Sequence, residues 1–149
     1  MTLNGNEMFL KMKQKGEYRP FVCLQFYNKK FYINTGLSFF PGILHEDSLF
    51  SLIALLNAKK TSHINQSYYK YRVLINSITK SFNINDLFGY LIIYCEIQKL
   101  MENSNIKNEL KSAIMSEIIE IKKKILKIYF WRRKNSFIEK NDNLSRNSI

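Results

Sequence analysis

Long hydrophobic runs are missing from the sequence. The most apolar stretch, LFGYLIIYC, covers only residues 87–95 before Glu96 interrupts it, whereas about 20 apolar residues are needed to cross a bilayer. This stretch therefore predicts a core helix and not a membrane span. The N-terminal residues MTLNGNEMFLKMK also lack a long apolar run ahead of their first basic cluster, so we expect no signal peptide.

Cysteine is scarce, and its spacing indicates neither a disulfide framework nor a metal site. Cys23 and Cys95 are the two cysteines; they form no CxxC pair, and neither has a histidine at ligand spacing. Both stand among apolar residues, which predicts two buried free thiols in a reducing compartment. We therefore expect a cytoplasmic protein.

Motifs of the common catalytic classes are absent from the sequence. It contains no GxxxxGK[ST], GxGxxG, GxSxG or HExxH pattern. His45 and His63 each lie near a predicted helix start without a second ligand at metal spacing, so we expect surface or capping histidines. Glu117 and Glu120, beside the lysines at 122–124, are typical of a solvated helix face. The sequence thus predicts neither an enzyme nor a cofactor.

Positive charge is what the sequence has in excess. It carries 23 Lys and Arg against 12 Asp and Glu, which gives a net charge of +11 and a pI near 9.7. Residues 1–45 contribute six cations and two acids, residues 46–104 six and five, and residues 105–149 eleven and five. This balance is typical of proteins that contact nucleic acid, an anionic membrane or an acidic protein. A basic, Lys-, Asn- and Ile-rich proteome would give the same composition without any such partner.

The first 45 residues alternate in the manner of a small sheet. Residues 6–13 alternate like a half-buried strand, and residues 21–27 and 31–39 are rich in β-forming residues. Asn28, Lys29 and Lys30 form a hairpin-length turn between the last two segments. The pattern predicts a three-stranded antiparallel meander, which needs a helix on one face to be stable.

The rest of the chain has helical periodicity. We expect helices over residues 48–60, 64–82 and 87–103, followed by a last helix that starts near residue 104. In that helix an apolar seam recurs at steps of three and four residues and must face another helix, in this chain or another. The seam comprises Leu110, Ile114, Ile118, Ile121, Ile125 and Ile128.

The predicted fold class is therefore α+β, a three-stranded antiparallel meander packed on helices and followed by a helical region. Residues 1–82 would form the sheet-plus-helix domain. Residues 83–135 would form the helical region with its basic end, and residues 136–149 a flexible tail.

Two groups of basic residues are candidates for a binding surface, and the first belongs to the predicted sheet. A small sheet fits the DNA major groove, where Lys and Arg hold phosphates while Asn and Gln bond to base edges. The alternative is that these lysines only protect an exposed sheet edge. The candidate DNA-binding residues are Lys11, Lys13, Arg19, Gln25, Lys29, Lys30, Tyr32 and Asn34.

The second group lies in KKKILKIYFWRRK, residues 122–134. A basic amphipathic helix of this kind can bind phosphates, a membrane surface or an acidic helix. Cations at a helix C-terminus also interact favourably with the helix dipole, which is a purely structural role. Trp131 is expected in the core. The cations of this secondary patch are Lys122, Lys123, Lys124, Lys127, Arg132, Arg133 and Lys134.

Residues 15–41 resemble a known family in three short motifs: KGE at 15–17, NKK at 28–30 and TGL at 35–37. They are similar to the N-terminal arm-type DNA-binding domain of tyrosine recombinases (the phage-integrase family), in the version common in Bacteroidetes phages and mobile elements. The resemblance implies a three-stranded sheet, backed by a helix, that enters the major groove of arm-site DNA. The family's catalytic His-x-x-Arg step is missing, because Ser48 follows His45 at that distance and Gln66 follows His63.

These patterns predict a non-catalytic protein that binds double-stranded DNA, as a recombinase-accessory or truncated integrase-like protein of a phage or mobile element. It would act in DNA recombination or integration, in the cytoplasm of a bacterium or a phage-infected host cell. The alternative is a structural or assembly protein, for instance a phage component, that binds a helical partner or a second copy through the 110–128 seam. A seam exposed in the monomer would favour that alternative, and a seam buried against the 87–103 helix would be core. Attachment to a membrane surface through residues 122–134 is a third, less favoured hypothesis.

Overall fold

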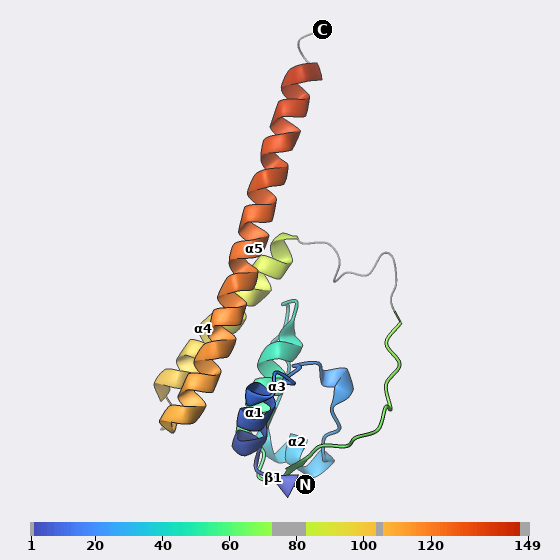
Figure 1. Ribbon diagram of the computed structural model, residues 1–149, viewed down its shortest axis with the longest axis vertical. Coiled ribbons are helices and arrows are strands. Elements are labelled where there is room, and N and C mark those ends of the chain that lie inside the picture. The colour runs from blue at the N-terminus through green and yellow to red at the C-terminus, as the bar shows by residue number, and fades with distance from the viewer. Residues whose placement is uncertain (1, 73–82, 104–105, 147–149) are drawn as a thin grey trace.

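The computed structural model describes residues 2–72, 83–103 and 106–146 of the 149-residue chain. This part contains five α-helices, a short 3₁₀ turn and two strands of two residues each (Figure 1). The helices are α1 (Gly5–Gln14), α2 (Lys29–Thr35), α3 (Glu46–Asn57), α4 (Ile84–Asn103) and α5 (Asn108–Arg146). The 3₁₀ turn is η1 (Val22–Leu24), and the strands are β1 (Thr2–Leu3) and β2 (Thr61–Ser62).

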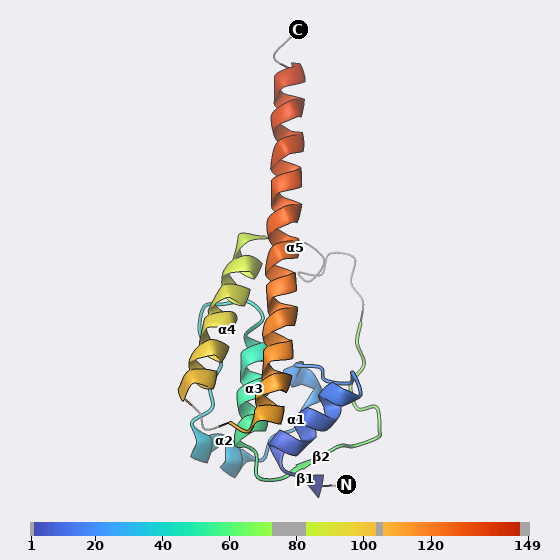
Figure 2. The same ribbon diagram turned by 60° about the vertical axis from the view of Figure 1, so that its left-hand side comes forward.

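The helices α4 and α5 form an antiparallel hairpin that lies beside α1 and α3 (Figures 1 and 2). Helix α3 packs against both α1 and α4, and α1 also contacts α5. The strands pair antiparallel, with Thr2 opposite Ser62 and Leu3 opposite Thr61. Beyond its contact with α4, α5 continues as a single helix that projects from the body of the molecule (Figure 2).

The predicted three-stranded meander is wrong, because the fold is mostly helical and the described sheet has only these two short strands. The first predicted strand falls within α1. Asn4 caps this helix: its side chain accepts the Glu7 backbone N–H at 2.9 Å, and the Glu7 carboxylate accepts the Asn4 N–H at 3.1 Å. Such a reciprocal capping box satisfies two backbone donors at once. Met8 and Phe9 are adjacent and both buried, which a strand with one buried face cannot provide.

The segment NKKFYINTG, the far half of the predicted hairpin, also forms a helix. The Asn28 side chain accepts the backbone N–H groups of Lys30 and Phe31 at 2.9 and 3.4 Å and so caps the start of α2. Gly36 ends the helix in the left-handed region, at φ 61°, where glycine has no steric penalty. The β-forming residues between these two caps suggested a strand, but the caps determine the local structure.

The other predicted helices have mixed outcomes. The helices expected over 48–60 and 87–103 are confirmed as α3 and α4, with shifted bounds. The helix expected over 64–82 is wrong for residues 64–72, which have no helical structure, and residues 73–82 lie outside the described residues. The predicted domain boundary at residue 82 falls in that same gap. Helix α5 includes residues 136–146 of the predicted tail.

The apolar seam of α5 is confirmed, and its partners lie within this chain. Ile114, Ile118, Ile121 and Ile128 are at most 4% exposed, in one core with Phe9 of α1, Leu52 of α3 and the α4 residues Ile93 and Ile97. The seam is therefore core by the criterion stated for it, and its buried isoleucines are not available to a partner.

A close approach fixes α4 against the segment that precedes α3. A β-carbon built on Gly89 would lie 2.3 Å from the carbonyl oxygen of Leu44. Replacing a helical glycine by alanine normally stabilises a helix by about 1 kcal/mol. For Gly89→Ala we expect the opposite, a fall of about 1–3 kcal/mol in the free energy of unfolding in denaturant, because of this clash. Cys95→Ala, at an exposed position of the same helix, is the control, and an unchanged or raised stability of Gly89→Ala would contradict this packing.

The helical state of α2 can be tested at Ile33, whose side chain is 62% exposed. In a helix, Ile33→Ala should raise the free energy of unfolding by a few tenths of a kcal/mol, since alanine is the better helix former. In a strand the same change should lower it, by up to about 1 kcal/mol. Urea unfolding gives the sign, and backbone NMR shifts of residues 29–35 report the local structure. A loss of stability with strand-like shifts would contradict the helix.

Candidate functional site

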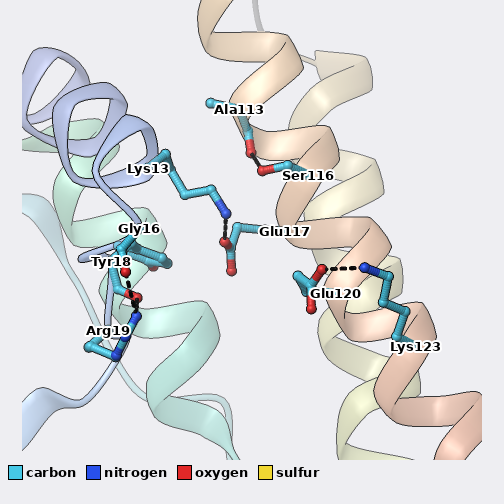
Figure 3. Close-up of polar contacts among 9 residues, drawn as sticks. All are labelled: Lys13, Gly16, Tyr18, Arg19, Ala113, Ser116, Glu117, Glu120 and Lys123. Carbon is cyan, nitrogen blue, oxygen red and sulfur yellow. Dashed lines mark hydrogen bonds and ion pairs between the residues drawn. The ribbon is translucent and has the colours of Figure 1, made fainter.

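The structure uses several of the predicted DNA-binding residues in contacts within the fold. The Lys13 ammonium of α1 forms an ion pair with the Glu117 carboxylate of α5 (Figure 3), and both side chains are about one-fifth exposed or less. Its nitrogen also lies 6.0 Å from the ring centroid of Tyr18. Lys11, on the same helix, is partly buried. Lys13 therefore joins the first and last helices of the chain.

Arg19 and Gln25 also make contacts within the fold. The Arg19 guanidinium donates to the carbonyl oxygens of Gly16 at 3.0 Å and Tyr18 at 2.9 Å, which closes the turn after α1 (Figure 3). The Gln25 amide donates to the Ser51 hydroxyl of α3 at 3.1 Å and accepts a bond from the Tyr27 hydroxyl. Ser51 is fully buried, so the amide of Gln25 is directed towards α3.

The remaining candidates lie on α2 with exposed side chains. Lys29 and Lys30 stand in its first turn, and Asn34 in its last. The Tyr32 ring is 42% exposed, with its centroid 6.5 Å from that of Phe50. These four residues share a short helix in place of the predicted hairpin. The eight candidates are thus divided among α1, the turn after α1, the segment after η1, and α2, and they form no common sheet surface.

The secondary basic patch lies on α5, where the helix leaves the body. Residues 122–134 contain seven Lys and Arg and no acidic residue. The side chains of Lys122, Lys123, Lys124, Lys127, Arg132 and Arg133 are all exposed, and Lys134 follows on the same helix. The stretch from Lys122 to Lys134 rises about 18 Å at 1.5 Å per residue. It is the densest run of positive charge without an intervening acidic residue in the sequence.

Tyrosines of α4 position two of these lysines. The ammonium of Lys122 lies 5.2 Å from the ring centroid of Tyr94, and that of Lys124 lies 5.0 Å from the centroid of Tyr90. Cation–π contacts of this kind hold a lysine without neutralising its charge. Lys123 bonds to Glu120 on its own helix at 2.7 Å (Figure 3). Sequence patterns could not reveal the two tyrosines, because these contacts depend on how α4 and α5 pair.

Aromatic side chains accompany the cations along the projecting helix. Tyr129, Phe130 and Trp131 are 53%, 58% and 43% exposed. The prediction that Trp131 belongs to the core is therefore wrong. Residues 129–133 are all exposed, so in this stretch of α5 the alternation of apolar and basic residues does not separate an inner from an outer face.

The cysteines and histidines form no chemical site. Cys23 and Cys95 are both exposed, so the prediction of buried thiols is wrong. His63 is exposed as well. In the parts of the chain that the structure describes, no three His, Cys, Asp or Glu residues are grouped so as to hold a metal ion.

His45 has a structural role at the joint between α3 and α4. It stands at the start of α3 with φ 66°, its ring nitrogen lies 2.8 Å from the Asp86 carboxylate, and its ring stacks on Tyr90 with centroids 4.3 Å apart. The other Asp86 oxygen accepts the backbone N–H of Asn83 at 2.8 Å, just ahead of α4. The histidine was expected at the surface or in a cap; it lies at the capping position, but its side chain bonds to the neighbouring helix.

No protein-family model matches the chain, and the comparisons with curated proteins and with solved structures also find no match. The resemblance of residues 15–41 to the arm-type recombinase domain therefore stays a prediction. None of the described helices is both long enough and apolar enough to cross a membrane.

The burial of Tyr90 at the joint between α3 and α4 can be tested by titrating its phenol. Burial raises its pKa to about 12 from 10.0, with the carboxylates of Asp86 and Asp47 adding to the shift. A phenol is neutral when protonated, so its contribution to stability is complete below pH 10 and is lost as the pH rises towards 12. Phenolate absorbance should show one tyrosine titrating near pH 12 that Tyr90→Phe removes. The variant should also lose less stability over this range. Removal of a phenol that titrates at pH 10 instead would contradict the burial.

Proposed function

We propose that the protein binds double-stranded DNA, without catalysis, through the basic segment of α5, residues 122–134. The observation that carries the proposal is the run of seven cations and no acid on one stretch of α5, which begins beside α4 and extends past the last buried isoleucine, Ile128. Each lysine or arginine that neutralises a phosphate releases bound counterions, which is the main source of affinity for DNA that does not depend on sequence.

The width of a helix such as this segment matches that of the DNA major groove. An α-helix with its side chains is about 10–12 Å wide, and the major groove of B-DNA is about 12 Å wide. Lys123 and Lys127 lie one turn apart on the side opposite the seam residues Ile121 and Ile128, and so point away from the body. Arg132 and Arg133 extend the charge beyond the last buried seam position.

The segment is favoured over the N-terminal candidates by what the cations contact. Lys13 is paired with Glu117 at about one-fifth exposure and Arg19 is bonded to backbone carbonyls, so both have roles in the fold. The Lys123 side chain, in contrast, is 66% exposed in its pair with Glu120. Lys29 and Lys30 are exposed on α2 but are only two charges on a short helix. An accessory role in recombination or integration is the role that the resemblance of residues 15–41 suggests. The sheet that the same resemblance implies is not found in the described residues, so the DNA contact is proposed for α5.

The proposal predicts that Lys123→Gln/Lys127→Gln weakens binding to a mixed-sequence duplex of about 30 base pairs, by about tenfold at about 0.1 M salt. The plot of log affinity against log salt should also become less steep by about 2, because two phosphate contacts are lost. Fluorescence anisotropy of a labelled duplex over a salt series measures both quantities.

Lys29→Gln/Lys30→Gln is the matched control, since it removes the same two side chains and the same charge from another exposed helix. It should leave the salt slope unchanged and the affinity within about twofold. Equal losses for the two variants would mean that only net charge matters. A loss confined to the α2 variant would place the contact on α2 and overturn the proposal.

A further inference from the structure

The face of the α4–α5 hairpin that points away from α1 and α3 is apolar and uncovered. On α4 its residues recur at steps of four, three and four; on α5 they follow a similar pattern. The large apolar side chains among them are between 42% and 57% exposed, and Cys95 is exposed as well. The set comprises Ile84, Phe88, Leu91 and Cys95 of α4 and Met115, Ile119, Leu126 and Tyr129 of α5.

A shallow open hollow runs between the two helices on this face. It is lined by Leu91, Tyr94, Lys122, Ile125 and Leu126. Four of these side chains are apolar or aromatic, and the ammonium of Lys122 stands over the ring of Tyr94. The hollow therefore presents apolar surface with one cation at its edge.

Both sides of α4 are apolar, which is unusual for a surface helix. Its inner side contributes Ile93 and Ile97 to the core, at 0% and 2% exposure, while Phe88 and Leu91 on its outer side are 57% and 43% exposed. A helix that is hydrophobic all round is normally buried, and large exposed apolar patches mark interaction sites. The outer side of α4 therefore has the apolar composition of a buried surface, although it is exposed.

We propose that this face binds an amphipathic helix of a partner protein whose apolar stripe is flanked by acidic residues. Residues 87–95 of α4 carry no charge. On α5, Lys122 lines the hollow, and the exposed Arg133 follows eleven residues later on the same side of the helix, so an acidic partner complements the groove. A helix lying along two helices is a common recognition mode. A second copy of this chain fits less well, because two proteins of charge +11 would repel each other. A membrane also fits less well, because the surface of this face is hollowed.

This inference does not depend on DNA binding. Lys122 lies in both surfaces, but Leu91 lies on α4, away from the basic segment. A substitution of Leu91 therefore tests the groove by itself.

The probe is a labelled helical peptide of about 18 residues, long enough to hold several turns. It has leucines at helical spacing and glutamates on both flanks. One control peptide has the same composition in scrambled order, and another has lysines in place of the glutamates. Anisotropy with the full-length protein should show the acidic amphipathic peptide binding at least tenfold more tightly than either control.

Leu91→Asp should weaken binding of that peptide at least tenfold. Leu24→Asp is the matched control, because Leu24 is 50% exposed and lies on η1, which contacts α3, and does not line the groove; it should leave binding unchanged. Lys122→Glu should reduce the preference for glutamate flanks over lysine flanks. Circular dichroism confirms that the variants fold. Both aspartate variants should bind duplex DNA equally, so failure of the groove and failure of the DNA proposal are distinguishable.

Several outcomes would overturn the inference. Equal affinity for the scrambled peptide, or unchanged affinity of Leu91→Asp, would show attraction by charge alone. A dimer in sedimentation equilibrium that Leu91→Asp dissociates would assign the face to a second copy. Binding to anionic vesicles that requires Leu91, without binding to the peptide, would assign it to a membrane surface.

Discussion

The packing of the α5 isoleucines against α4, α1 and α3 is the interaction on which the rest of the structure depends. Each fully buried isoleucine contributes about 1.5–3 kcal/mol, so the loss of any one among Ile114, Ile118, Ile121 and Ile128 would remove a large part of the net stability of a typical domain, about 5–15 kcal/mol. The seam ends at Ile128, whereas the helix continues to Arg146. Beyond Ile128 the helix therefore continues past the buried seam, and the exposed side chains of Arg132 and Arg133 are available to a polyanion.

The sequence predicted this seam correctly and the N-terminal third incorrectly, and the reason is the length of each pattern. A helical period sustained over about five turns has no competing interpretation. Segments such as 6–13 and 31–39 are too short for that, and their β-forming residues favoured strands. Local capping decides the outcome: Asn4 with Glu7 starts α1, and Asn28 with Gly36 bounds α2. Both sets of caps were visible in the sequence, and weighting them above alternation would have given helices.

The candidate site was predicted in part. Residues 122–134 were identified as a basic helix, and they form the middle of α5. The roles of Lys13 and Gln25 within the fold could not be predicted, because Glu117 and Ser51 become their neighbours only through packing between elements distant in the sequence. The uncovered side of α4 had a readable signal, since residues 87–95 contain no charge to mark a solvent face. That stretch was interpreted as core alone, although only half of its circumference is buried.

Helix α5 thus combines two surfaces, the cationic segment of residues 122–134 and an apolar groove shared with α4. The central claim is that this cationic segment, and not the N-terminal third, contacts DNA. Backbone NMR shifts of the isotope-labelled protein, recorded while duplex DNA is added at low salt, test it most directly. The account predicts shift changes concentrated at residues 122–133, with residues 11–34 little affected. Changes concentrated on α2 and the turn after α1, with α5 unaffected, would contradict it.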